Sequence, residues 1–339
     1  MARSLKEFKS SYLELINNFL WRQWSALGVA GYAESRDNWF IDPEALLLFT
    51  CSLGRYDARL FDEMLDWLDV NGTLINIQRL RNIQKKEQFN SEKVLKAIAS
   101  IMSKRSKYFK WKTLALLNRE ELINKEENLF LTKEGNTIES FGTPDKDFQE
   151  YGLIRGKIEF RGHTQPVRIL QNTGLLIKLR ALLGVNTRCE IILHLLTHNS
   201  AHPALIAKET YYAQKTIQDL LVEMSHSGLI NISLVGKEKH YWLDRVKWFD
   251  FLKIQNDSLR WVKWPEMFKA LEETWLKIND DKLLNYDSLL LSSELRVLMQ
   301  KIKPKIESAG FLGTLSDEKL FFGENYTEVF YNDLKKLFE

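Results

Sequence analysis

The stretch from Thr187 to Leu243 decides the fold: TRCEIILHLLTHNSAHPALIAKETYYAQKTIQDLLVEMSHSGLINISLVGKEKHYWL. Glu190 follows Thr187 by three residues, which is the spacing of a capping box and predicts a helix that begins at Thr187. Apolar side chains then recur along one stripe of this helix, at Ile191, Ile192, Leu195 and Leu196. The polar pair Asn199-Ser200 ends it.

Two more helices follow in the same stretch. Pro203 fits the first turn of a short helix, about 201–209, because the first N–H groups of a helix have no partner inside it. Leu205 and Ile206 are predicted to point inward from this helix, and residues 210–212 form a turn. A third helix, about 213–227, ends before Gly228, which suits a left-handed C-cap. Its buried stripe is predicted to be Ile217, Leu220, Leu221 and Met224.

A β-hairpin is predicted after the third helix. Residues 229–235 have the composition of a strand, 236–239 form a turn, and 240–243 pair back with the first strand. The stretch therefore predicts three helices and a hairpin in this order. The outer face of the third helix is formed by Gln214, Lys215, Gln218 and Asp219.

This unit resembles winged helix-turn-helix domains of the MarR and ArsR type from residue 187 to 243. The segment 213–220, AQKTIQDL, is similar to the Ser-Gln-x-Thr-Val start of many recognition helices, and 227–230 is similar to their exit into the wing. Two positions differ from the family: Ala213 replaces the capping Ser or Thr, and Tyr211 stands where such turns use glycine. The resemblance implies a DNA-binding transcriptional regulator or DNA-associated protein.

The same resemblance implies which residues contact double-stranded DNA. We expect Gln214, Lys215 and Gln218 to meet base edges or phosphates in the major groove, because amides pair with adenine and lysine with guanine. Thr216 is expected to bind a phosphate from the first turn of the helix. Lys237 and Lys239, on the wing, are expected to contact the adjacent backbone.

The charge of the unit leaves a second interpretation open. Its lysines are Lys208, Lys215, Lys237 and Lys239. Nearby acidic residues in the sequence are Glu209, Asp219, Glu223 and Glu238. A unit with so little net charge offers few unpaired cations to phosphates. The alternative is a protein-interaction module, such as the antitoxin-like partner of a neighbouring nucleotidyltransferase toxin, or a homodimer contact.

Composition indicates the class and location of the whole chain. It has 339 residues, of which 45% are hydrophobic, and a net charge of +3, so it can form several cores and is mildly basic. Cys51 and Cys189 both lie in apolar helical patterns, which favours free thiols and a reducing cytoplasm. No apolar run approaches the roughly 18 residues of a membrane span, so we expect no membrane contact.

The rest of the chain is predicted to be mainly α-helical and divided into several domains. We expect a helical N-terminal domain (1–125), an extended linker or wrapping segment (126–175), the winged domain (176–246) and a helical C-terminal domain (247–339). Asp42-Pro43-Glu44 predicts the start of a core helix. A later helix, about 74–86, is predicted to turn Arg79 and Arg81 outward. Whether the N-terminal helices form a second helix-turn-helix stays open.

The sequence gives only weak indications of a metal site, of a second phosphate-binding segment and of a nuclease. His194 and His198 share a helix face, and His202 follows, but without further ligands we predict no metal site. The basic segment KRSKYFKWK (104–112) could bind phosphates, although a solvated helix end is the favoured interpretation. Pro144-Asp145 and Glu159-Phe160-Arg161 match the PD…ExK nuclease pattern only loosely, since Arg replaces Lys. With no phosphate loop and no nucleophile elbow, we predict no enzyme, no catalytic residue and no cofactor.

Overall fold

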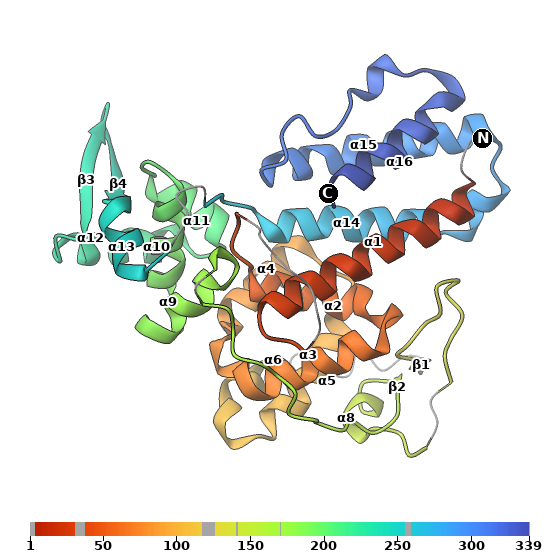
Figure 1. The fold of residues 1–339 in the computed structure, drawn as a ribbon, viewed down its shortest axis with the longest axis horizontal. Coiled ribbons are helices and arrows are strands. Elements are labelled where there is room, and N and C mark those ends of the chain that lie inside the picture. The colour runs from red at the N-terminus through yellow and green to blue at the C-terminus, as the bar shows by residue number, and fades with distance from the viewer. Residues whose placement is uncertain are drawn as a thin grey trace.

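The computed structural model describes residues 4–30, 38–116, 126–139, 142–169, 171–254 and 259–338. It is mainly helical, as predicted (Figure 1). Within these residues, no helix has both the length and the apolar character needed to cross a membrane. The predicted domain boundary at residue 125 falls outside them, and the division into four domains stays a prediction.

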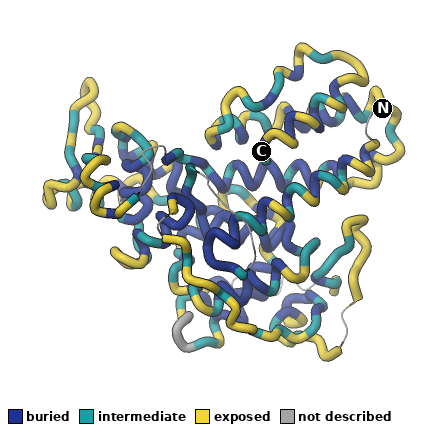
Figure 2. Tube along the Cα trace, viewed as in Figure 1, coloured by how far each residue is buried: buried dark blue, intermediate teal, exposed yellow. Residues whose placement is uncertain are grey.

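Capping residues determine where the N-terminal helices begin. These helices are α1 (Leu5–Ala26), α2 (Pro43–Leu53), α3 (Ala58–Asn71), α4 (Ile77–Glu87) and α5 (Glu92–Ser103). Asp42 accepts a hydrogen bond from the backbone N–H of Ala45, and Pro43 occupies the first turn of α2, as predicted. Asp57 caps α3 in the same way. All residues of α2 are buried, so it is the core helix that the sequence indicates (Figure 2).

Short elements lie between the N-terminal helices and after them in the chain. They are η1 (Gly54–Tyr56), η2 (Gly72–Leu74), η3 (Ser106–Trp111), α6 (Lys112–Ala115), α8 (Lys146–Gln149), η4 (Asn172–Gly174), and the parallel strands β1 (Glu127–Asn128) and β2 (Leu153–Ile154). The Arg55 guanidinium donates to the backbone oxygens of Asn128 and Leu129, at 3.0 and 2.8 Å. Arg155 pairs with Asp62 at 2.8 Å. These contacts tie the segment after residue 126 to the N-terminal helices.

The stretch from residue 187 to 243 forms the predicted three helices and hairpin. After α9 (Leu175–Leu183), the elements are α10 (Thr187–Thr197), α11 (Pro203–Thr210), α12 (Gln214–Ser225), β3 (Ile230–Val235) and β4 (Glu238–Leu243). The two strands are antiparallel, with Ile230 opposite Leu243 and Val235 opposite Glu238. Gly228 has a φ of 72°, which fits its predicted left-handed conformation.

Three details of this stretch differ from the sequence prediction. The cap of α10 is Asn186, whose side chain accepts from the N–H of Arg188, so Thr187 is the first helical residue and not the cap. Glu190 is buried and pairs elsewhere, which leaves no capping box. Leu205 is 40% exposed because it lies on the outer side of the short helix α11, whereas its neighbour Ile206 is buried.

Some of the C-terminal helices pack on the N-terminal ones. They are α13 (Arg245–Leu252), α14 (Trp264–Ile278), α15 (Ser288–Ser308) and α16 (Tyr326–Lys336), with η5 (Asp281–Asn285), η6 (Glu318–Leu320) and η7 (Gly323–Asn325) between them. Helix α14 contacts both α1 and α2, and α15 lies against α14 and α16 (Figure 1). The Trp264 indole donates to the Phe40 carbonyl at 2.6 Å, and the Phe8 and Tyr331 rings stack at 3.7 Å. Helix α15 continues past Pro304 to Ser308.

A buried ionic network joins α2, α4, α9 and α10. Glu44 accepts from Arg79 at 2.7 Å and from Arg180 at 2.6 and 2.8 Å. Arg79 also binds Asp42 at 2.5 and 2.8 Å, and Arg180 binds Glu190 at 2.6 Å. All five side chains are buried. The prediction that Arg79 faces outward is therefore wrong; the carboxylates that bind it come from a distant part of the sequence.

The network keeps its groups charged despite burial. Burial alone raises the pKa of Asp42, but the charge and hydrogen bonds of Arg79 outweigh it and lower that pKa. Burial opposes the charged form of Arg180, but Glu44 and Glu190 together raise its pKa. Three carboxylates and two guanidiniums thus stabilise one another, and removal of either guanidinium leaves its carboxylate partners buried without a counter-charge.

We therefore predict that Arg180→Met lowers the free energy of unfolding by about 3–5 kcal/mol, because Glu44 and Glu190 lose a buried partner. Urea unfolding measures this loss. The control is Lys215→Met, which also replaces a cation by methionine but in an exposed ion pair with Asp219. It is expected to alter stability little. Similar effects of both substitutions would show that the buried network does not stabilise the fold.

A second prediction concerns the orientation of α12. Ile217 and Leu221 are fully buried, whereas Leu220, expected on the same stripe, is only partly buried. We expect Leu221→Ala to cost about 2–5 kcal/mol, Leu220→Ala less, and Gln218→Ala under about 0.5 kcal/mol. Chemical denaturation of the three variants checks this order. Equal losses for Leu221→Ala and Gln218→Ala would contradict the orientation described.

Candidate nucleic-acid interface

The first turns of α12 present a polar, exposed face. Gln214, Lys215, Thr216 and Gln218 are all exposed, as the sequence predicts for the outer side of this helix. Ala213, which precedes the helix, makes no side-chain capping hydrogen bond. The N–H groups at the start of α12 therefore have no side-chain acceptor from the capping position, and the positive end of the helix dipole faces outward.

The hairpin and α12 enclose a groove. A hollow of about 400 Å³ is lined by His202, Pro203, Gln214, Gln218, Lys237, Glu238, Lys239 and Tyr241. Four of the six residues predicted to contact DNA thus line one recess, while Lys215 and Thr216 lie on the exposed helix outside it. Backbone hydrogen bonds in both directions between Ala201 and Tyr241, each 2.9 Å, hold the hairpin against the start of α11. The groove has a fixed shape for this reason.

The charges around this groove are less balanced than the sequence indicates. Lys215 pairs with Asp219 at 2.7 Å. Glu209, however, is buried, and Glu223 pairs with Arg188 at 2.6 Å. Within the part of the chain that the structure describes, Lys208, Lys237 and Lys239 have no carboxylate partner. The surface near α12 therefore carries lysines without a carboxylate partner, which a count of charges along the sequence does not reveal.

Helix α4 holds the turn between α11 and α12 in place. Arg79 Nε donates to the Thr210 carbonyl at 3.0 Å, and Asn82 Nδ2 donates to the Tyr211 carbonyl at 2.8 Å. Tyr211 has a φ of 65°, a conformation that costs energy for a residue with a side chain. Its hydroxyl donates to Glu87 at 2.7 Å. These contacts stabilise the turn without the glycine that related turns use.

Local sequence does not predict that residues of α4 position this turn. Tyr212 adds another contact, because its hydroxyl accepts from Asn76 Nδ2 at 2.8 Å. One signal in the sequence indicates such contacts: two tyrosines occupy a turn where glycine is expected, so something outside the turn must bind them. Local sequence does not show which residues make these contacts, because Asn76 and Tyr212 are 136 positions apart in the chain.

A cluster of titratable side chains forms where α10 and α11 meet the residue before α14. His194 and His198 stack with ring centroids 3.9 Å apart, and their nitrogens lie with a Glu209 oxygen within 4.8 Å of one another. Glu209 also binds the Lys263 ammonium at 2.9 Å. The two histidines and Glu209 can act as metal ligands only if the Lys263 ammonium moves away, because it already supplies a positive charge to Glu209. His202 lies apart from them, beside His240 at 5.8 Å between ring centroids, and the absence of a metal stays a prediction.

Burial and hydrogen bonding set the charges in this cluster. Burial lowers the pKa of His194 to about 4, despite its 2.9 Å hydrogen bond with Glu209, so the imidazole is neutral at pH 7. Burial alone raises the pKa of Glu209, but hydrogen bonds with His194 and Lys263 outweigh it and lower that pKa to about 2. The cluster therefore contains one carboxylate and one ammonium, and it links α10 and α11 to the residue before α14.

Most of the remaining sequence candidates have partners within the fold, although Phe109 is 74% exposed. In the basic segment 104–112, Lys104 pairs with Asp147, Arg105 pairs with Asp69, and Lys110 donates to backbone carbonyls at 2.7 Å. Trp111 is buried; the side chain of Tyr108 lies outside the described residues. In the nuclease-like pattern, Asp145 caps α8 by accepting from two backbone N–H groups. Both segments already have structural partners.

Comparison with known proteins identifies no relative: no family model, no curated protein and no solved structure matches the chain.

The His194 pKa generates a prediction about pH. The folded state keeps this imidazole neutral down to about pH 4, whereas in the unfolded chain it accepts a proton below about pH 6.5. The unfolded state thus binds more protons in this window, and stability falls as the pH decreases from 6.5 to 4. We expect His194→Gln to reduce this loss by about 2 kcal/mol between pH 7 and 4.5.

Urea unfolding at both pH values measures the effect. His226→Gln, a change at an exposed histidine, is the control and should leave the pH dependence as in the wild type. An unchanged pH dependence in His194→Gln would contradict the buried neutral imidazole.

Proposed function

We propose that this protein binds double-stranded DNA through a winged helix-turn-helix, as a transcriptional regulator or DNA-associated protein. The observation that carries the proposal is the groove in which Gln214 and Gln218 on α12 face Lys237 and Lys239 at the hairpin. Amides at such positions can pair with base edges in the major groove, and the lysines can neutralise backbone phosphates. Helix α12 is then the recognition helix and the hairpin is the wing.

Electrostatics supports this proposal. Phosphate neutralisation by unpaired cations supplies much of the affinity of proteins for DNA. Lys208, Lys237 and Lys239 lack carboxylate partners among the described residues, since Glu209 and Glu223 bind other groups. Thr216 and the start of α12 add a hydroxyl and backbone N–H donors, which bind phosphate well at a helix N-terminus. A cytoplasmic location accords with this function and with the two buried, free cysteines.

A protein-interaction module is the second candidate, and exposed apolar side chains favour it. On the hairpin, Leu234 is 71% exposed and Ile232 is 45% exposed, and Leu229 before β3 is 58% exposed. A protein partner or a second copy of the chain would bury such side chains. An antitoxin-like partner of a nucleotidyltransferase toxin is one example. Such a protein would purify with its partner and would not bind duplex DNA.

The deciding prediction compares two kinds of substitution on a duplex selected from random sequences and on an unrelated duplex. Lys237→Gln with Lys239→Gln should weaken binding to both and lower the salt slope by about 2, because phosphates are present in every sequence. Gln214→Ala with Gln218→Ala should cost about 1–3 kcal/mol per lost base contact on the selected duplex and little on the other, because base-edge contacts need the right base.

Fluorescence anisotropy at several salt concentrations measures both effects. Lys282→Gln, a change at an exposed lysine far along the chain, is the charge control and should leave binding unchanged. If the wild-type protein binds neither duplex at micromolar concentration and about 50 mM salt, DNA binding is wrong and the interaction module stands in its place.

A further inference from the structure

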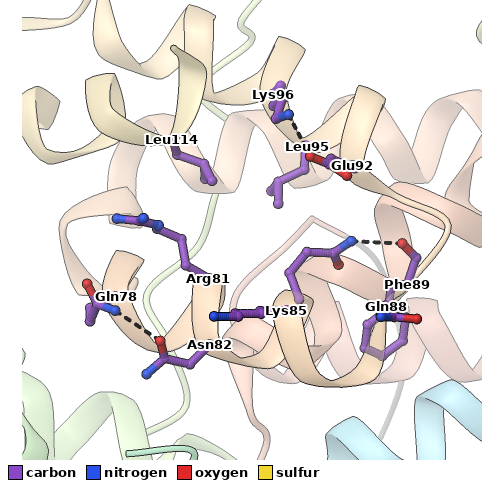
Figure 3. A pocket seen from close by; sticks show the side chains of 11 residues that line it. Gln78, Arg81, Asn82, Lys85, Gln88, Phe89, Glu92, Leu95, Lys96 and Leu114 are labelled. Atoms are coloured by element: carbon purple, nitrogen blue, oxygen red, sulfur yellow. Dashed lines mark hydrogen bonds and ion pairs between the residues drawn. The ribbon is translucent and has the colours of Figure 1, made fainter. Parts of the chain in front are cut away.

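A second hollow lies on the N-terminal helices next to the turn that precedes α12. It has a volume of about 700 Å³ and opens between α4 and α5, with Leu114 at one side. Figure 3 shows Arg81 and Lys85 on the α4 side of this hollow, while Leu95 and Lys96 lie on the α5 side. Lys96 pairs with Glu92 at 2.6 Å and adds no net charge. Arg81 and Lys85 therefore determine its positive charge.

A third recess lies between this hollow and the groove at the wing. This recess, between α4 and α11, is lined by Asn82, Lys86, Ala204, Ala207, Lys208, Tyr211, Tyr212 and Gln214. Asn82 also lines the hollow on α4. Gln214 also lines the groove at the wing. The three recesses are separate hollows that adjoin at these two residues, and we call this row of recesses, from the hairpin past α11 to α4 and α5, the track.

Unpaired cations follow this track. Arg81, Lys85, Lys86 and Lys208 have no carboxylate partner among the residues that the structure describes. The Lys86 ammonium lies 4.5 Å from the centroid of the Tyr211 ring, which orients it beside the turn without neutralising it. With Lys237 and Lys239 at the other end, the cations that line the track outnumber its carboxylates, Glu92 and Glu238, so the track suits a polyanion.

The cations on α4 have a fixed position relative to α12. Asn82 and Arg79 donate to the turn carbonyls of Tyr211 and Thr210, at 2.8 and 3.0 Å. Arg79 is in turn held by the buried carboxylates of Asp42 and Glu44. A polyanion bound at α12 therefore meets the α4 cations without any rearrangement of the protein, which avoids the cost of ordering them.

We propose that α4 is a second phosphate-binding surface for the duplex that α12 recognises. Lys86 and Lys208 contact the backbone beside the recognition helix, and Arg81 and Lys85 contact phosphates farther along the same side. This inference rests on the proposed DNA binding. It adds that the bound duplex extends beyond the winged unit on one side, so that the N-terminal helices contribute affinity but no base recognition.

The test uses the full chain and a duplex of roughly 30 base pairs, about three helical turns, with a selected site at its centre. The variant is Arg81→Gln with Lys85→Gln, and the control is Lys282→Gln with Lys319→Gln, which removes the same charge from exposed lysines elsewhere. We expect the α4 variant to lower the salt slope by about 2 and to weaken binding roughly 10- to 100-fold at 0.1 M salt. Preference for the selected site should stay as in the wild type.

A nuclease-protection footprint adds a readout that a general charge effect cannot mimic. The α4 variant should shorten protection at one end of the site only, and Lys237→Gln with Lys239→Gln should not shorten that end. An unchanged slope and footprint in the α4 variant, or a loss equal to that of the control, would overturn the α4 surface while DNA binding through α12 stands. Absence of binding by the wild type would overturn both proposals, and tighter binding of an RNA duplex would overturn the choice of DNA.

Discussion

The structure depends on the carboxylate of Glu44, which lies between the guanidiniums of Arg79 and Arg180 in the buried interior. Desolvation of these charges costs several kcal/mol per ion, so only a precise arrangement of partners makes their burial tolerable. Asp42 and Glu190 complete that arrangement. Because the five residues come from the start of α2, from α4, from α9 and from α10, the network fixes these elements in one relative position. Apolar packing alone tolerates small shifts; charge pairing in a dry interior does not.

The same network determines how the candidate interface is presented. Arg79 uses one nitrogen for the Thr210 carbonyl while its others bind Asp42 and Glu44, so the turn before α12 is attached directly to the ionic centre. The left-handed Tyr211 is held by α4 rather than by its own backbone preference. A recognition helix usually owes its orientation to its own small domain. In the function that we propose, the N-terminal helices share that role, because α4 binds the turn before α12 and fixes the position of its own cations relative to α12.

Much of the fold could be predicted from local sequence, because its signals are short-range. The Asp42-Pro43 start of α2 and the order of helices and hairpin after residue 187 follow from capping, helical periodicity and turn chemistry, and the structure confirms them. The interior charges could not be predicted: Arg180 and Glu44 are 136 positions apart, and nothing local distinguishes Arg79 from the exposed Arg and Lys side chains of the same helix. The exposure of Leu205 and the incomplete burial of Leu220, which does pack against the core, could not be predicted, because periodicity locates an apolar stripe but not the width of the surface that it packs against.

The charge of the candidate site could not be predicted from local sequence either, and this charge matters for the proposed function. Counted along the sequence, the acidic and basic residues near α12 cancel. In space they separate in part, because Glu209 is buried against His194 and Lys263, and Glu223 pairs with Arg188 at the surface. Glu238 stays exposed on the wing, whereas Lys208 and the wing lysines have no carboxylate partner among the described residues. A polyanion responds to exposed, unpaired charge within about one Debye length and not to a total of +3 over the chain. A mildly basic protein can therefore present a basic track when some of its carboxylates are buried in ion pairs. Asp42, Glu44 and Glu190 are buried in this way here.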